Sequence, residues 1–218
     1  MLEFQDFFSA CAGQWKTERT YHSVLSGEIE RSYTEFRVNT LDSSEKQRIL
    51  SGSESSEGFD TLTLDGDVAQ VNKTCPGFAI AFDTRSETGE EVSMSLKALF
   101  VPDNQVTADI SLPEFAHLPV AASVSNADSE VIQGFYLRDQ GYSEAGAIAG
   151  RFTYHPIRHT LEMITYYRRS VAVDQMRLIA PDLRLRTIVT YQKPPAGEPP
   201  TVIDLVGFGV EHKTPAAS

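Results

Sequence analysis

Cysteine, basic charge and long apolar runs are all scarce in this sequence of 218 residues. The two cysteines, Cys11 and Cys75, lack the spacing of metal ligands and do not suggest a disulfide framework. The net charge of -11 argues against nucleic acid or an anionic membrane surface as a partner. No apolar stretch approaches the length that spans a bilayer, and residues 1–6 lack the features of a signal peptide. These absences predict a cytoplasmic protein without membrane insertion.

The composition is that of an ordinary globular protein, with 41% hydrophobic and 22% charged residues. The length fits one large β domain or two small domains. Because no internal repeat and no linker is visible, we expect residues 1–218 to form a single domain. The histidines are His22, His117, His155, His159 and His212. None of them is spaced with carboxylates or thiols as metal ligands are, so we expect no metal ion.

Helical spacing is clearest at the N-terminus. Phe4, Phe7, Phe8 and Cys11 recur on one helix face, and Gly13 follows as a C-cap. After Gly13 the apolar period changes to two, which is typical of strands. The strands that we expect comprise residues 15–22, 28–41, 59–64, 77–84, 91–102, 129–137, 147–155, 161–169, 174–179, 184–192 and 201–212.

This order of elements predicts an all-β fold. About ten short strands, one N-terminal helix and no β-α-β rhythm indicate an antiparallel barrel closed by hairpins. Residues 42–58 are polar and predict a loop with at most one helical turn, and residues 104–128 are ambiguous because prolines interrupt them. A barrel of roughly eight to ten strands can hold one small ligand in its mouth or lumen.

Arg184 and Arg186 stand out in the run of residues 180–187, which opens with a turn at Pro181. Residues two apart in a strand share a face, so the two guanidiniums point the same way. Such a pair suits two carboxylates or phosphates. The alternative is an exposed edge that carries two solvated arginines. In a closed barrel, we expect the face that the two arginines share to be the interior face and not an exposed edge.

Three runs of residues resemble one known family. The first run resembles the opening of that family and consists of Phe7, Phe8, Gly13, Trp15, Arg19 and His22. The second run resembles its central part and consists of residues 137–144 followed by 149–152. The third run, residues 180–187, resembles its most recognisable segment. Together and in this order, they resemble the S-type (CpcS/CpeS-like) bilin lyases of phycobiliproteins. Members of this family are calycin or lipocalin-like barrels that attach linear tetrapyrroles to the antenna proteins of cyanobacterial phycobilisomes. The resemblance therefore implies a calycin-like barrel of about ten strands with an N-terminal helix.

The resemblance also implies a reaction. A phycobilin, either phycocyanobilin or phycoerythrobilin, would be held extended while a cysteine thiolate of a phycobiliprotein alpha or beta subunit attacks its ethylidene group. The bilin is then a transferred substrate and no cofactor is permanently bound. Cys11 lies on a helix face with Phe8 and is expected to be a small buried hydrophobe. The reacting thiol is expected to belong to the acceptor protein.

The resemblance assigns roles to several residues. Arg184 and Arg186 would bind the bilin propionates, or else form a structural pair on the barrel floor. Asp174 is the candidate catalytic acid, which would hydrogen-bond the pyrrole nitrogens; its alternative is a surface carboxylate. Arg19 and Trp15 would stack on the pigment or close the barrel bottom, and the structural alternative is favoured for Trp15.

Two further residues complete the predicted ligand-binding set. Phe82 would offer an aromatic face to the pigment, although aromatic residues in strands usually belong to the core. Arg151 would be a second propionate partner or, as we favour, a charge at the rim.

The sequence departs from the family pattern at several positions. Tyr166, Asp174 and Gln175 replace a usual Glu, Glu and Arg, while Phe82 replaces a common Trp and Ile188 a common Ser. These departures leave open which bilin is held, and whether the chain acts alone, as a homodimer or as a heterodimer with a related lyase. They also leave open a non-catalytic carrier of a bilin or a fatty acid in the same barrel.

Overall fold

Ten antiparallel strands and two α-helices make up the described part of the chain in this computed structural model, which covers residues 1–53, 73–106, 118–119, 131–141 and 148–215. The helices are α1 (Phe4–Cys11) and α2 (Ser43–Ser53), with a short 3-10 turn at Asp103–Gln105. The strands are β1 (Gly13–Ser23), β2 (Ile29–Thr40), β3 (Gly77–Ser86), β4 (Glu91–Pro102), β5 (Ile132–Arg138), β6 (Ile148–His155), β7 (Thr160–Tyr166), β8 (Ser170–Ala180), β9 (Leu183–Gln192) and β10 (Ile203–Thr214).

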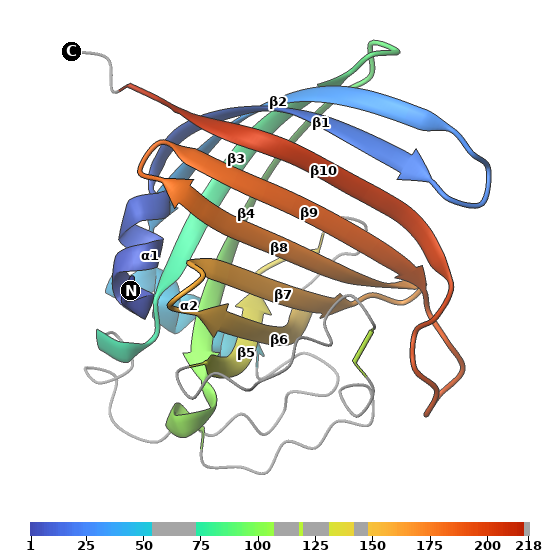
Figure 1. The fold of residues 1–218 in the computed structure, drawn as a ribbon. Coiled ribbons are helices and arrows are strands. Elements are labelled where there is room, and N and C mark those ends of the chain that lie inside the picture. Colours follow the sequence, from blue (N-terminus) through green and yellow to red (C-terminus); the bar gives the residue numbers. More distant parts are fainter. Residues whose placement is uncertain (54–72, 107–117, 120–130, 142–147, 216–218) are drawn as a thin grey trace.

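The strands form a closed up-and-down barrel (Figure 1). Each strand pairs with the next one in the chain, and β1 closes the ring by pairing with β10. Closure leaves no open sheet edge among the ten described strands, because each of them has a partner on both sides. The predicted antiparallel barrel of about ten strands with an N-terminal helix is confirmed.

Most of the predicted strands coincide with observed ones, and the strand predicted over residues 91–102 has the bounds of β4. The strand predicted over residues 59–64 lies outside the described residues. The strand predicted over residues 174–179 begins too late, because β8 starts at Ser170. The first four residues of β8, which the prediction missed, alternate as a strand does. Val171 and Val173 are buried, whereas Ser170 and Ala172 line the cavity.

The expectation of a loop with at most one helical turn over residues 42–58 is wrong at its start, where α2 forms. Asp42 Oδ1 accepts a hydrogen bond from the Glu45 N–H at 2.8 Å, and Glu45 Oε2 accepts one from the Asp42 N–H at 3.0 Å. This reciprocal pair is a capping box, which satisfies two otherwise unpaired N–H groups at a helix start. Ile49 then packs with Leu41 and Cys75 in a cluster beside β4 and β5.

We expect Asp42→Ala to lower the melting temperature by about 2–4 °C, because the substitution removes the side chain that caps α2. The measurement is thermal unfolding followed by circular dichroism. Ser43→Ala, at the first helical residue, is the matched control because Asp42 and Glu45, not Ser43, form the capping box. Equal melting temperatures for the two variants would show that the capping box contributes nothing.

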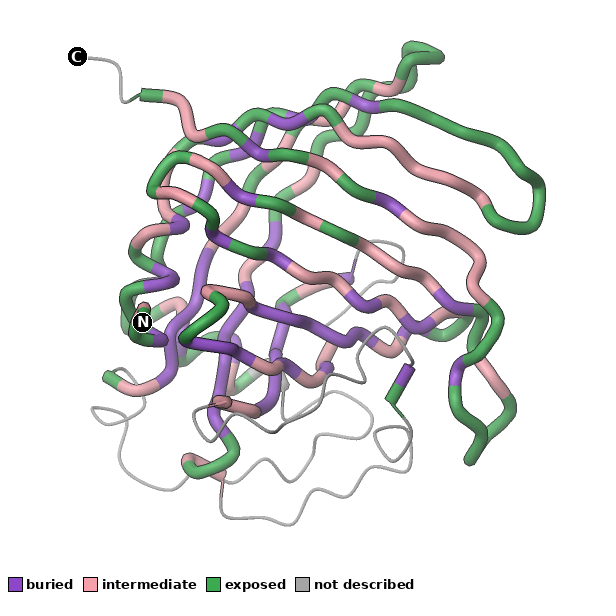
Figure 2. The backbone as a smooth tube through the Cα atoms, in the orientation of Figure 1, coloured by how far each residue is buried: buried purple, intermediate pink, exposed green. Residues whose placement is uncertain are grey.

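Helix α1 closes one end of the barrel, opposite the β1–β2 hairpin (Figures 1 and 2). Its buried face carries Phe4, Phe7, Phe8 and Cys11. The ring centroids of Phe8 and Phe100 are 4.7 Å apart, and Phe4 stacks on Phe152 at 5.4 Å. Burying each such ring contributes roughly 1.5–3 kcal/mol. The closed end is therefore a packed aromatic core, and the barrel interior is filled from this end.

Candidate functional site

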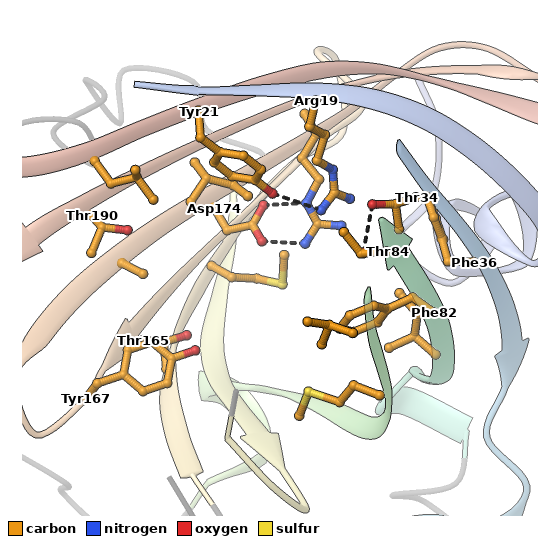
Figure 3. Close-up of a pocket in the computed structure, with 18 of the residues that line it drawn as sticks. Arg19, Tyr21, Thr34, Phe36, Phe82, Thr84, Thr165, Tyr167, Asp174 and Thr190 are labelled. Atoms are coloured by element: carbon orange, nitrogen blue, oxygen red, sulfur yellow. Dashed lines mark hydrogen bonds and ion pairs between the residues drawn. The ribbon is translucent and has the colours of Figure 1, made fainter. Parts of the chain in front are cut away.

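A cavity of about 470 Å³ occupies the part of the barrel interior away from α1, and Figure 3 shows side chains that line it. This volume is within the usual range for sites of small organic ligands. The apolar lining consists of Phe36, Ile80, Phe82, Val92, Met94, Tyr136, Met163, Ala172, Ile188 and Leu205. The polar lining consists of Arg19, Tyr21, Thr34, Thr84, Arg138, Thr165, Tyr167, Ser170, Asp174, Arg186 and Thr190.

Strand β9 places its two arginines inside the barrel, as the alternation predicts. Arg184 is 1% exposed and Arg186 lines the cavity, whereas Leu185 between them is exposed on the outer wall. The two arginines nevertheless lie at different depths, because two residues along a strand correspond to about 6.6 Å. Arg186 faces the large cavity. Arg184 borders a separate void of about 20 Å³ nearer the closed end.

Arg186 forms an ion pair with Asp174 of the neighbouring strand β8. Its Nε donates to Asp174 Oδ1 at 2.8 Å, and its Nη2 contacts Oδ2, so the fork engages both carboxylate oxygens. The Asp174 and Arg186 side chains are 19% and 11% exposed, and both line the cavity. The candidate acid and one candidate propionate ligand are therefore brought together, and Figure 3 shows Asp174 turned toward the guanidinium.

Arg184 pairs with Glu211, a residue that the sequence analysis did not single out. The two residues face each other across β9 and β10, and Nε of Arg184 donates to Glu211 Oε2 at 2.8 Å. Arg19 reaches the other oxygen, Oε1, at 3.0 Å. Glu211 is fully buried. Burial opposes its ionisation, but the positive charges of Arg184, Arg186 and Arg19 outweigh that effect and hold the pKa of Glu211 below its usual value.

Trp15 forms part of the same buried floor. The Arg184 guanidinium carbon lies 3.9 Å from the centroid of the Trp15 ring, and the indole N–H donates to the Cys11 carbonyl at 2.9 Å. Trp15 is 1% exposed and is not among the residues that line the large cavity. Its position agrees with the structural alternative, in which Trp15 closes the barrel bottom. Arg19 lies farther along β1 than Trp15 and lines the large cavity. Phe82 lines the same cavity.

Arg151 points away from the cavity. Its guanidinium forms a bidentate pair with Asp103, at 2.7 and 2.6 Å, and lies 4.4 Å from the centroid of Phe135. The side chain faces outward because the next residue on β6, Phe152, occupies the interior core. The structure thus does not bring Arg151 to the other candidate ligand-binding residues, and we do not carry it into the proposed site.

Arg138 and Tyr167 are cavity residues to which the sequence analysis gave no role. Arg138 is 2% exposed, its Nη1 donates to the Tyr167 hydroxyl at 3.0 Å, and its Nε donates to the Gln140 carbonyl at 3.1 Å. Arg138 belongs to the run 137–144 that carries the family resemblance. The signal that could have found it is its alternation with Leu137, which packs on the outer side of the same strand.

Both cysteines are free and buried, and burial raises the pKa of each thiol. Protonated thiols are poor nucleophiles and poor metal ligands. Among the residues that the structure describes, no group of three or more His, Cys, Asp or Glu side chains could hold a metal ion. No described helix is long and apolar enough to cross a membrane.

The chain matches known proteins over nearly its whole length. The model of the family described as CpeS-like protein matches residues 3–109 and 116–213. The chain is 38% identical, over 98% of its own length and 97% of the relative, to "Chromophore lyase CpcS/CpeS 1" of Synechococcus sp. (strain JA-3-3Ab). It is 23% identical, over 85% of the chain and 79% of the relative, to "Chromophore lyase CpcS/CpeS 2" of Synechocystis sp. (strain ATCC 27184 / PCC 6803 / Kazusa).

A solved structure has the same fold. The S-type phycobiliprotein lyase CPES from Guillardia theta aligns with a TM-score of 0.64 and 15% identity, over 99% of each chain. The chain therefore shares its overall fold with that protein. The match to the family model and the relative that is 38% identical over nearly the whole chain show that the chain belongs to the CpeS-like family.

Proposed function

We propose that this protein is a chromophore lyase, which binds a phycobilin in the barrel cavity and joins it through a thioether bond to a cysteine of a phycobiliprotein alpha or beta subunit. The observation that carries the proposal is an apolar cavity containing the Arg186–Asp174 pair, in a chain that matches a curated lyase from end to end. The bilin, phycocyanobilin or phycoerythrobilin, is a transferred substrate.

The lining suits the three chemical features of a phycobilin. The conjugated system lies against apolar and aromatic side chains such as Phe82 and Met94. A propionate of the bilin binds the guanidinium group of Arg186. In the protein without bilin, the Asp174 carboxylate occupies that position. Asp174, displaced from that position, accepts hydrogen bonds from the pyrrole N–H groups and favours the protonated, more electrophilic pigment. Arg19 offers a second cation on the same side of the cavity.

The test is a transfer assay with bilin and apo-subunit, in which the covalent product is detected by zinc-induced fluorescence. We expect product to form faster than by spontaneous addition, and Asp174→Asn to slow its formation by at least tenfold. Arg151→Ala, on the outer wall, is the matched control and is expected to transfer like the wild type. Product that forms no faster than spontaneous addition would overturn the proposal.

The same assay addresses the alternatives. A bilin carrier would bind the pigment tightly and give no product. A partner subunit would be inactive alone and active when co-expressed with a related lyase. We place the protein in the cytoplasm, and the two free thiols Cys11 and Cys75 support a reducing compartment.

A further inference from the structure

Bond formation requires a proton to be moved at the open end of the cavity. The acceptor thiol must lose its proton, the C–S bond forms at the ethylidene carbon, and the adjacent ring carbon gains a proton as the double bond breaks. No oxidant or reductant is needed. Because the thiol arrives on another protein, the group that takes and returns this proton must stand where the cavity opens.

Asp174 lies too deep for that task. It is four residues along β8 from Ser170, which begins the strand at the open end, and this separation is about 13 Å along the strand. A cysteine side chain on a docked protein does not span such a distance. The carboxylate therefore suits the pigment nitrogens, and proton transfer at the thiol needs another residue.

Tyr167 stands at the required place. It follows β7 directly, and its backbone N–H donates to the Ser170 carbonyl at 2.8 Å in the hairpin that borders the opening. Its side chain lines the cavity, across from Phe82 in Figure 3. The residue is 9% exposed, so a thiol that enters the opening meets the phenol in a largely desolvated setting.

Arg138 acts on the phenol oxygen. Its Nη1 donates to that oxygen at 3.0 Å, and both side chains are buried. A cationic donor at the phenol oxygen stabilises negative charge that develops there during proton transfer, and arginine keeps its charge at any working pH. Arg138 Nε donates a hydrogen bond to the Gln140 carbonyl at 3.1 Å, and this bond to the backbone holds the guanidinium in position.

We propose that Tyr167, activated by Arg138, is the acid–base residue of thioether formation. The phenolate takes the proton of the acceptor thiol, the thiolate attacks the ethylidene carbon, and the phenol returns the proton to the adjacent ring carbon. Arg138 is the positioning residue that stabilises the phenolate. This inference rests on the proposed lyase function and assigns one step of it.

The chain offers a matched control in the neighbouring residue. Tyr166 is the last residue of β7 and packs on the outer wall with Ile164, Val171 and Val173. Tyr166→Phe and Tyr167→Phe each remove one hydroxyl, the first from the outer wall of the barrel and the second from the cavity. Bilin binding is measured by the absorption spectrum, and transfer by the rate of zinc-fluorescent product between pH 6.5 and 9.5, a range of roughly one to two units around the thiol pKa of about 8.5.

We expect Tyr167→Phe to bind bilin within about threefold of the wild type and to transfer it about a hundredfold more slowly at pH 7. The deficit should shrink as the pH rises past the thiol pKa, because solvent then removes the proton. Tyr166→Phe should transfer like the wild type. Equal rates for Tyr167→Phe and wild type, or a deficit that does not change with pH, would overturn the role of Tyr167. A wild type that forms no product overturns the lyase function itself.

Discussion

Replacing Glu211 by Gln is expected to lower the free energy of unfolding by about 3–5 kcal/mol, because it leaves the buried Arg184 and the partly buried Arg19 without their counter-charge. Arg184 and Arg19 hold the two oxygens of Glu211 at 2.8 and 3.0 Å. Glu211 is 0% exposed and the Arg184 side chain 1% exposed, so water cannot replace the lost charge. Substitution of Glu211 is therefore expected to be among the most destabilising substitutions in the chain.

Trp15 makes this effect directly measurable. It is the only tryptophan, and its ring lies 3.9 Å from the Arg184 guanidinium carbon, so its fluorescence reports on the cluster during urea unfolding. The control is Glu35→Gln, which breaks the exposed pair with Lys16 and should leave the unfolding midpoint almost unchanged. If the two variants unfold at the same urea concentration, the buried cluster does not stabilise the barrel.

The same residue predicts a pH dependence. The pKa of Glu211 is held below its usual value, so the unfolded chain binds a proton at this site more readily than the folded chain does. The stabilisation is fully present above the unfolded pKa and is lost as the pH falls through the folded pKa. We therefore expect the difference in stability between wild type and Glu211→Gln to be constant near neutral pH and to shrink in acid.

The barrel was predictable because its signals are local. Alternation with period two marks each strand, and helical spacing at residues 4–11 marks the helix that closes one end. The error at α2 was also local, since Asp42 and Glu45 have the spacing of a capping box and could have been recognised. Elements of this kind depend on neighbours within a few residues.

Glu211 was not predictable in the same way. A single Glu near the end of a strand is ordinarily exposed. Its burial follows from register, because β10 places it opposite Arg184 on one side and Thr17 on the other. The split between Arg184 and Arg186 has the same origin. Sequence alternation treats the two arginines as equivalent, whereas α1 and Trp15 fill the closed end and leave only Arg186 beside the large cavity.

The different depths of the two arginines predict different phenotypes for their removal. Arg184→Ala leaves Oε2 of the buried Glu211 without its guanidinium partner while Arg19 still holds Oε1, and should lower the free energy of unfolding by about 3–5 kcal/mol. Arg186→Ala leaves Asp174 at a cavity wall that water reaches, and should cost only about 1 kcal/mol. Urea unfolding of both variants measures this difference.

Bilin binding should show the reverse order. A charged hydrogen bond to a propionate contributes roughly 1.5–3 kcal/mol, so Arg186→Ala should weaken binding of the free acid by about tenfold to a hundredfold, and by more than Arg184→Ala does. Arg186→Lys should restore only part of the affinity, because an ammonium group lacks the planar fork. The measurement is titration of each variant with bilin, followed by absorption.

A bilin esterified at both propionates separates charge recognition from packing. It has no carboxylate for Arg186 to hold, so wild type and Arg186→Ala should bind it about equally, while only the wild type gains affinity for the free acid. Phe82→Ala is the complementary variant, because it removes an apolar contact and should weaken binding of the free acid and the ester alike. If Arg186→Ala keeps the full preference for the free acid, the propionates are bound elsewhere and the Arg186–Asp174 pair only stabilises the barrel wall.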